Sequence, residues 1–225
     1  MSDTNVLRVA GLSGILFLIL FIPSYLTAPD SPIATSSGQE MLDYFRSRQG
    51  EILTFNGIML IFASFFFLWF LGGLYEMARR AEDGGFGFAP VVLGGGLLFI
   101  ALMLAGAVAE IAHAATQARF QNFREDEQIG FLSLAMSGWF YRFAFVGIAA
   151  MIAATSAGGL RAKLVPAWLA WVGFAVAIVA LLRYFGPLGG WLFMSWMLAV
   201  SILMIIGALG RPLPAAAREV TPTGG

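Results

Sequence analysis

The amino-acid sequence predicts an all-α, multi-pass membrane protein in which six transmembrane helices form one bundle. Apolar and aromatic residues make up 59% of the 225-residue chain, and charged residues only 12%. A soluble domain has roughly 45–50% apolar and about 25% charged residues. The apolar residues also fall into runs long enough to cross a hydrocarbon core of about 30 Å, which needs about 20 helical residues. Composition and run length therefore indicate the same class.

Six apolar runs divide the chain, which we expect to fold as a single transmembrane domain over residues 1–225. The runs cover residues 9–27, 52–77, 90–115, 131–157, 165–183 and 189–209. We expect the first run to remain as an anchor rather than be removed as a signal peptide, because it lacks an A-x-A cleavage site and Pro29 follows Ala28. The last residues, 211–225, are predicted to form a disordered cytoplasmic tail.

The distribution of basic residues predicts that both termini lie in the cytoplasm. With the N-terminus inside, seven basic residues fall on the inner side and five on the outer side, as the positive-inside rule favours. The inner group is Arg8, Arg79, Arg80, Arg161, Lys163, Arg211 and Arg218, and the outer group is Arg46, Arg48, Arg119, Arg124 and Arg183. We interpret the excess of Arg over Lys, with abundant Ala and Gly, as a sign of a GC-rich bacterial genome. The expected location is the bacterial cytoplasmic membrane.

The longest predicted outer loop, residues 28–51, contains the signal of a short amphipathic helix. Ser37 and Glu40 have the spacing of a capping box. Met41, Leu42 and Phe45 follow at helical spacing, with polar residues on the opposite face. We expect this helix to lie on the outer leaflet of the membrane.

Three segments resemble those of a family of small, uncharacterised six-helix membrane proteins of high-GC bacteria, classed as a domain of unknown function. The segments are Asp43-Tyr44-Phe45-Arg46, the run Phe66-Phe67-Leu68-Trp69-Phe70-Leu71-Gly72-Gly73-Leu74 and the run Leu164-Val165-Pro166-Ala167-Trp168-Leu169-Ala170-Trp171-Val172-Gly173. The resemblance implies the same helix count and implies no activity.

Ionisable residues inside apolar spans are the main candidates for a site, because such groups are costly in a bilayer and tend to face the protein interior or a wet cavity. The candidates are Glu110, His113, Arg142 and, at the outer end of the fifth span, Arg183. Glu110 and His113 are three residues apart and therefore share a helix face. Asn56 and Thr54, near the outer end of the second span, are further polar residues that could join the same cluster.

Two interpretations of these residues remain open. In the structural one, Glu110 and Arg142 form an ion pair that holds the third span to the fourth, with His113 hydrogen-bonded nearby. In the functional one, the residues line a polar pocket in the outer half of the bundle. The glycines Gly94, Gly95 and Gly96 lie inside an apolar span, and we expect them to serve close helix packing.

Several chemistries are disfavoured by the sequence. A formal net charge of zero gives no reason to expect a nucleic-acid partner, and the absence of Cys excludes thiolate chemistry. Because the chain has a single His, a di-iron site with two Glu-x-x-His motifs cannot form within one protomer. We therefore expect no metal, no cofactor and no catalytic residues. The expected partners are the lipid bilayer and either another membrane protein or a second copy of the chain.

The sequence favours a non-enzymatic accessory or ligand-binding module with an outer-half polar pocket. The first alternative is a small-solute or ion-coupled transporter that uses Glu110, and it predicts a water-accessible cavity with a broken or mobile helix beside that residue. The second alternative is a membrane-embedded enzyme in which Glu110 and His113 act as an acid–base pair.

Overall fold

The computed structural model describes residues 3–27, 36–80, 87–120, 126–182 and 188–207, together with positions 32, 82, 122, 124 and 209. Within these residues the chain is helical and contains no strand, which confirms the all-α class. The helices are α1 (Asp3–Thr27), α2 (Gly38–Glu51), the π-helix η2 (Ile52–Met59), α3 (Leu60–Arg80), α4 (Ala89–Arg119), α5 (Glu127–Arg161), α6 (Ala167–Leu182) and α7 (Leu188–Ile205). The candidate residue Arg183 and the predicted tail 211–225 lie outside the described residues.

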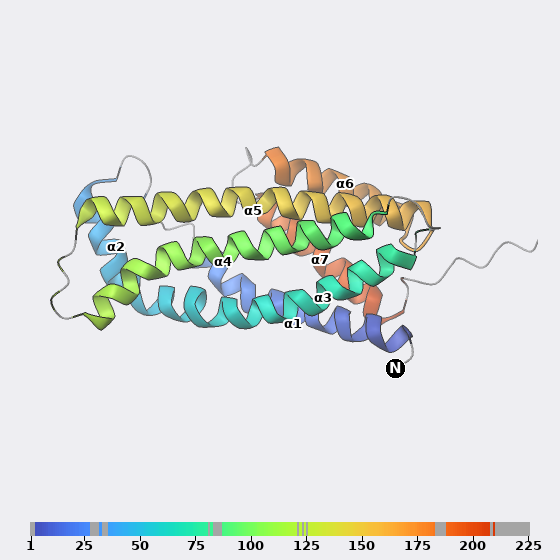
Figure 1. Ribbon diagram of the computed structural model, residues 1–225, viewed down its shortest axis with the longest axis horizontal. Coiled ribbons are helices and arrows are strands. Elements are labelled where there is room, and N and C mark those ends of the chain that lie inside the picture. Colours follow the sequence, from blue (N-terminus) through green and yellow to red (C-terminus); the bar gives the residue numbers. More distant parts are fainter. Residues whose placement is uncertain are drawn as a thin grey trace, which may run out of the picture.

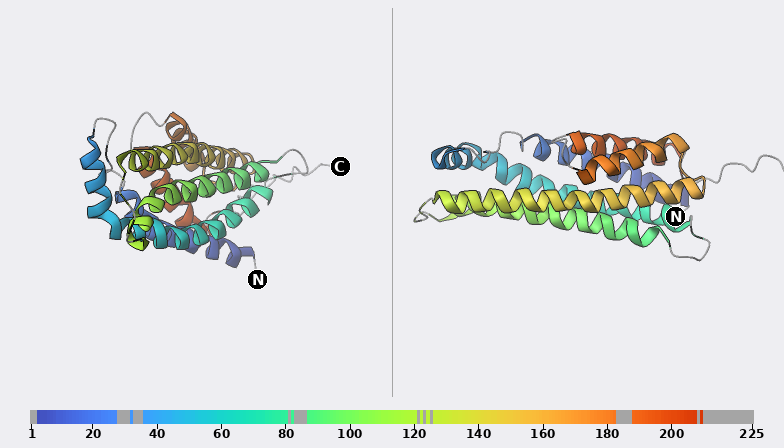
Figure 2. Two further views of the ribbon diagram at one scale, coloured as in Figure 1. Left: turned by 60° about the vertical axis from the view of Figure 1, so that its left-hand side comes forward. Right: turned by 90° about the horizontal axis from the view of Figure 1, so that it is seen from above.

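The long helices run side by side along one axis, and α2 lies across one end of the bundle (Figures 1 and 2). The helices α4 and α5 are in contact along much of their length, whereas the shorter α6 and α7 accompany α5 over only one half (Figure 1). The first residue of α1 and the last residue of α7 both lie at the end away from α2. We call the end that carries α2 the α2 end.

Five helical stretches are long and apolar enough to cross a membrane, and they make this a multi-pass membrane protein. They are Asn5–Leu26, Gly38–Arg80, Ala89–Arg119, Glu127–Arg161 and Leu188–Ile205. The helix α6 is apolar but has only 16 residues, or about 24 Å of helix, less than the hydrocarbon thickness of about 30 Å. Six complete crossings therefore remain a prediction.

The capping box predicted before α2 is present. The Ser37 Oγ accepts a hydrogen bond from the Glu40 backbone N–H at 3.2 Å, and the Glu40 carboxylate accepts one from the Ser37 N–H at 2.8 Å. The helix differs from the prediction beyond this point, because it continues through η2 into α3 without a loop. Its apolar residues Met41 and Phe45 are buried in a cluster with Ala114 of α4. The apolar face of α2 therefore packs on the bundle, and the contact of α2 with the outer leaflet remains a prediction.

Glycines bring α4 and α5 into backbone contact. A Cβ placed on Gly95 would lie 2.7 Å from the carbonyl oxygen of Gly147, and a Cβ on Gly147 would lie 2.5 Å from that of Gly95. The neighbouring Gly96 receives the side chain of Leu71 from α3. Close packing of small residues is the usual way in which membrane helices associate. The expectation for the Gly94–Gly96 segment is thus confirmed for Gly95 and Gly96.

Candidate functional site

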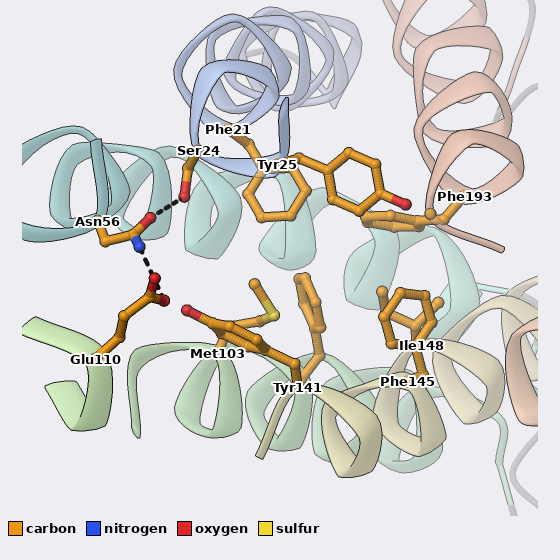
Figure 3. A pocket seen from close by; sticks show the side chains of 12 residues that line it. Phe21, Ser24, Tyr25, Asn56, Met103, Glu110, Tyr141, Phe145, Ile148 and Phe193 are labelled. Carbon is orange, nitrogen blue, oxygen red and sulfur yellow. Dashed lines mark hydrogen bonds between the residues drawn. The ribbon is translucent and has the colours of Figure 1, made fainter. Parts of the chain in front are cut away.

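The carboxylate of Glu110 is buried between four helical elements near the α2 end. Glu110 is on α4, and only 6% of its surface is exposed. Its Oε1 accepts a hydrogen bond of 2.9 Å from the hydroxyl of Tyr44 on α2, and its Oε2 accepts one of 3.2 Å from the Nδ2 of Asn56 on η2. The Oδ1 of Asn56 accepts a further hydrogen bond from the hydroxyl of Ser24 on α1 (Figure 3). One polar chain thus joins α1, η2, α4 and α2.

The π-helix η2 presents Asn56 to this carboxylate. The backbone N–H of Leu60 bonds to the carbonyl of Phe55, five residues earlier, instead of four as in an α-helix. Ile52 and Asn56 are the buried residues of η2. A π-helix turns less per residue than an α-helix and is frequently found at functional sites. The irregular segment therefore lies directly beside the most deeply buried carboxylate of the spans.

Glu110 also lines a cavity of about 90 Å³ inside the bundle. Ser24, Asn56, Glu110 and the hydroxyl of Tyr141 form its polar end, and aromatic and aliphatic side chains form the remainder (Figure 3). The lining residues are Phe21, Ser24, Tyr25, Asn56, Phe99, Met103, Glu110, Tyr141, Phe145, Ile148, Gly190 and Phe193. A water molecule occupies about 30 Å³ in the liquid, so the cavity has room for a few waters or one small organic group.

The charge of Glu110 is not balanced by a basic side chain among the described residues. The ion pairs of this part of the chain join Asp43, Glu51 and Glu76 to arginines on their own helices. The groups close to Glu110 are neutral, and include Ser137 and Tyr141 on α5 besides Tyr44 and Asn56. A carboxylate can accept about four hydrogen bonds. Tyr44, Asn56, Ser137 and Tyr141 can supply four such donors, and all of them are neutral, so the surroundings of Glu110 satisfy its hydrogen bonds without supplying a countercharge.

His113 is buried in a different environment from Glu110. Only 3% of its surface is exposed, and its ring packs on Phe45 of α2 with the ring centroids 4.2 Å apart. The shared buried face predicted for Glu110 and His113 is present, but His113 does not line the cavity. The two side chains therefore do not meet at one open site.

The ion pair between Glu110 and Arg142, on which the structural interpretation depends, is not formed. The Arg142 guanidinium lies over the ring of Trp139, 4.8 Å from its centroid, and the side chain is exposed. Its neighbour Tyr141 faces the cavity instead. Successive residues of an α-helix are rotated by about 100°, so Arg142 points away from α4. Arg183, the remaining candidate, is outside the described residues.

The sequence also indicated two further polar residues, Asn56 and Thr54, that could join the cluster. Asn56 belongs to the site, whereas Thr54 is exposed. Sequence reasoning missed Tyr44, Ser24 and Tyr141. Tyr44 lies three residues after Met41 and next to Phe45, on the apolar face of α2. That periodicity indicated a buried hydroxyl, which requires a hydrogen-bond partner.

No group of three or more His, Asp or Glu side chains in the described part of the chain could hold a metal ion. Comparison with protein-family models, curated proteins and solved structures found no match to this chain.

Proposed function

We propose that this protein binds a small organic cation, with an ammonium group and a short apolar body, in the Glu110 cavity. The observation that carries this proposal is a buried carboxylate, without a basic partner among the described residues, at the polar end of a largely aromatic cavity. Burying an unpaired charge in a membrane is costly. A cationic ligand would supply the missing countercharge.

The shape and chemistry of the cavity favour a cation over other ligands. An anion would be repelled by Glu110, and a neutral ligand would leave its buried charge without a countercharge. Aromatic faces such as those of Phe145 and Phe193 attract ammonium groups and pack against short alkyl chains. The volume of about 90 Å³ limits the ligand to a few non-hydrogen atoms.

The proposal can be tested by thermal stabilisation of the purified protein in a mild detergent. The probes are n-butylammonium, 1-butanol and butyrate, which share one alkyl chain and differ in charge. We expect only n-butylammonium to raise the Tm of wild type, since a ligand that binds the folded state stabilises it by about 2.7 kcal/mol at a hundred times its Kd. Glu110→Gln should lose this shift.

A surface variant controls for nonspecific charge effects. Glu127→Gln removes the same charge from an exposed site in the first turn of α5 and should keep the full Tm shift. Equal shifts for all three probes, or a shift that Glu110→Gln retains, would refute the cation site.

A second candidate function is transport of the same class of solute, coupled to Glu110. The observation that favours it is the π-helix η2, which contacts Glu110 through Asn56, because irregular helices beside a binding site are typical of transporters. Proteoliposomes that contain wild type should then accumulate labelled tetramethylammonium, a quaternary cation without a membrane-permeant neutral form, in response to a pH gradient, and Glu110→Gln proteoliposomes should not. A purely binding protein would show no flux. The enzyme alternative loses its geometric support, because His113 does not line the cavity.

The membrane arrangement is also part of the proposal. We infer six crossings with both termini in the cytoplasm of a bacterium, and the α2 end at the outer face. The shared position of the ends of α1 and α7, away from α2, supports an even number of crossings (Figure 1). Cysteine labelling at Ser47, which is exposed on α2, tests the sidedness in whole cells, and the absence of native Cys makes the assay clean.

A further inference from the structure

A groove lies between α1 and α3, in the half of the bundle away from the α2 end. Its volume is about 550 Å³, and its lining residues come from these two helices alone. The helices touch where Gly73 receives the Cβ of Ala10, whereas a Cβ on the adjacent Gly72 would have no atom within 4 Å. One glycine therefore joins the helices, and the other leaves the groove open. The lining residues are Val6, Val9, Ala10, Leu68, Trp69, Gly72, Gly73, Glu76 and Arg80.

The groove is polar at the membrane surface and apolar toward the middle of the bilayer. Arg80 is the last residue of α3 and of the helical stretch Gly38–Arg80 that can cross the membrane. Leu68 precedes Arg80 by about 18 Å of helix, slightly more than half of a hydrocarbon core of about 30 Å. A ligand in this groove would therefore have its polar part at the surface and its apolar part toward the bilayer centre, which is the orientation of a lipid.

The apolar part of the groove is formed by side chains that protein does not cover. Val6 and Val9 on α1, and Leu68 and Trp69 on α3, are all exposed. In a membrane-spanning bundle such side chains contact lipid chains, and the groove gives one chain a defined path between two helices.

The polar end of the groove carries a net positive charge. The Glu76 carboxylate accepts a hydrogen bond of 3.1 Å from the Nε of Arg80. It also accepts two from Arg79, from the Nε at 3.0 Å and the Nη2 at 3.1 Å. These two guanidinium groups and one carboxylate together carry one positive charge. The end of α3 is therefore suited to an anion at the depth of the lipid headgroups.

We propose that the groove between α1 and α3 binds an anionic phospholipid, with the phosphate on Arg80 and an acyl chain along the apolar wall toward Leu68. Guanidinium groups form paired hydrogen bonds with phosphate oxygens. Anionic phospholipids are the anions that the bilayer itself supplies, and basic pockets between membrane helices bind their headgroups. This site does not depend on the function proposed for Glu110, which lies near the opposite end of the bundle.

Native mass spectrometry of the full chain in mild detergent tests the site. The protein is equilibrated with equal amounts of phosphatidylglycerol and phosphatidylcholine that carry the same acyl chains. We expect wild type to retain one phosphatidylglycerol with a preference of about fivefold, which corresponds to the contribution of about 1 kcal/mol from one basic residue near an anionic surface. Arg80→Gln should lower the preference to about twofold or less. Arg80→Lys should give an intermediate value, because Lys keeps the charge but lacks the paired donors.

Matched variants separate the site from general charge and folding effects. Arg161→Gln removes an exposed arginine from the last residue of α5, at the same end of the bundle but outside the groove, and should leave the preference unchanged. Gly72→Leu fills the groove without a clash and should abolish retention even if Arg80→Gln fails to fold. Gly94→Leu adds the same side chain to an exposed glycine of α4 that also has no atom near its Cβ position, and should retain the lipid.

Several results would overturn the proposal. They are equal retention of the two lipids by wild type, an unchanged preference in Arg80→Gln, an equal loss in Arg161→Gln, or a lipid-free dimer, which would show that a second copy covers the groove. Displacement of the lipid by glycerol 3-phosphate at the same concentration would also contradict it, because that anion lacks the acyl chains that the groove is proposed to hold.

Discussion

The hydrogen bond from Tyr44 to Glu110 can be tested by a double-mutant cycle. Tyr44→Phe removes one hydroxyl, whose oxygen lies 2.9 Å from the Glu110 Oε1, and leaves the ring in place. Glu110→Met removes the carboxylate and keeps a side chain of similar length. Both residues are buried, at 7% and 6% exposure. The coupling free energy of the pair therefore reports this contact with little contribution from solvent.

The expected coupling follows from the surroundings of the bond. A hydrogen bond to a charged group contributes about 1.5–3 kcal/mol in soluble proteins. Bonds between membrane helices average only about 0.6 kcal/mol, with a maximum near 1.7. Because the Glu110 carboxylate has no basic partner among the described residues, we expect a value near the upper end of the membrane range, about 1–1.7 kcal/mol.

The assay is reversible unfolding of the purified protein in mixed detergent micelles, followed for wild type, both single variants and the double variant. Thr155→Val serves as a distant partner for a control cycle, because the Thr155 hydroxyl bonds to Met151 within α5. Distant sites add to within about 0.3–0.5 kcal/mol. A Tyr44–Glu110 coupling inside that interval would refute the proposed role of α2 in holding the carboxylate.

Three further predictions concern the packing around the site. Gly95→Ala should lower the free energy of unfolding by about 1–3 kcal/mol, because the added Cβ would meet backbone atoms of α5. Gly94→Ala is the matched control, because a Cβ at that position meets no atom within 4 Å. It should leave the free energy of unfolding unchanged or raise it by up to about 1 kcal/mol. Ser37→Ala should lower the free energy of unfolding by about 0.5–2 kcal/mol, because it removes the N-cap hydrogen bond of α2. An unchanged Tm would show that α2 is stable without this cap. His113→Ala should lower the free energy of unfolding by about 1–3 kcal/mol. It should leave the Tm shift caused by butylammonium unchanged, because the His113 ring packs on Phe45 outside the cavity. Loss of that Tm shift would instead place His113 at the site.

The sequence allowed the helices and part of the site to be predicted, because both depend on local patterns. Apolar runs located the long helices, and the Ser37–Glu40 spacing located the start of α2. The position of Glu110 inside a span indicated a buried carboxylate, and Asn56 was recognised as a candidate neighbour. Each of these inferences needs only residue type, spacing and the cost of burying polar groups in a bilayer.

The partners of Glu110 were less predictable, because they depend on how distant segments meet. The change from polar to apolar residues near position 51 predicts a boundary between the outer loop and the second span, whereas the helix continues across this boundary through η2. No sequence pattern specifies the wider π turn that presents Asn56. The sequence pattern places Tyr44 on a helix at the membrane surface, whereas its hydroxyl donates a hydrogen bond to Glu110 of α4.

Arg142 shows how a correct helix can carry a wrong contact. Gly138, Ala149 and Ala153 lie on the same helical stripe as Arg142, and small residues at this spacing favour a packed helix face. Ala149 is indeed buried, but α6 and α7 accompany α5 over one half only (Figure 1). The stripe is therefore covered at Ala149 and open at Gly138 and Arg142.

The central claim, a cation site anchored by Glu110, is tested most directly by photolabelling with a small alkylammonium that carries a diazirine. Peptide mapping of labelled wild type should place the label on cavity residues such as Met103 or Phe145. Unlabelled butylammonium should suppress this label, and Glu110→Gln should lose it. Label confined to lipid-facing residues such as Phe65 and Trp171, at equal levels in wild type and Glu110→Gln, would contradict the account.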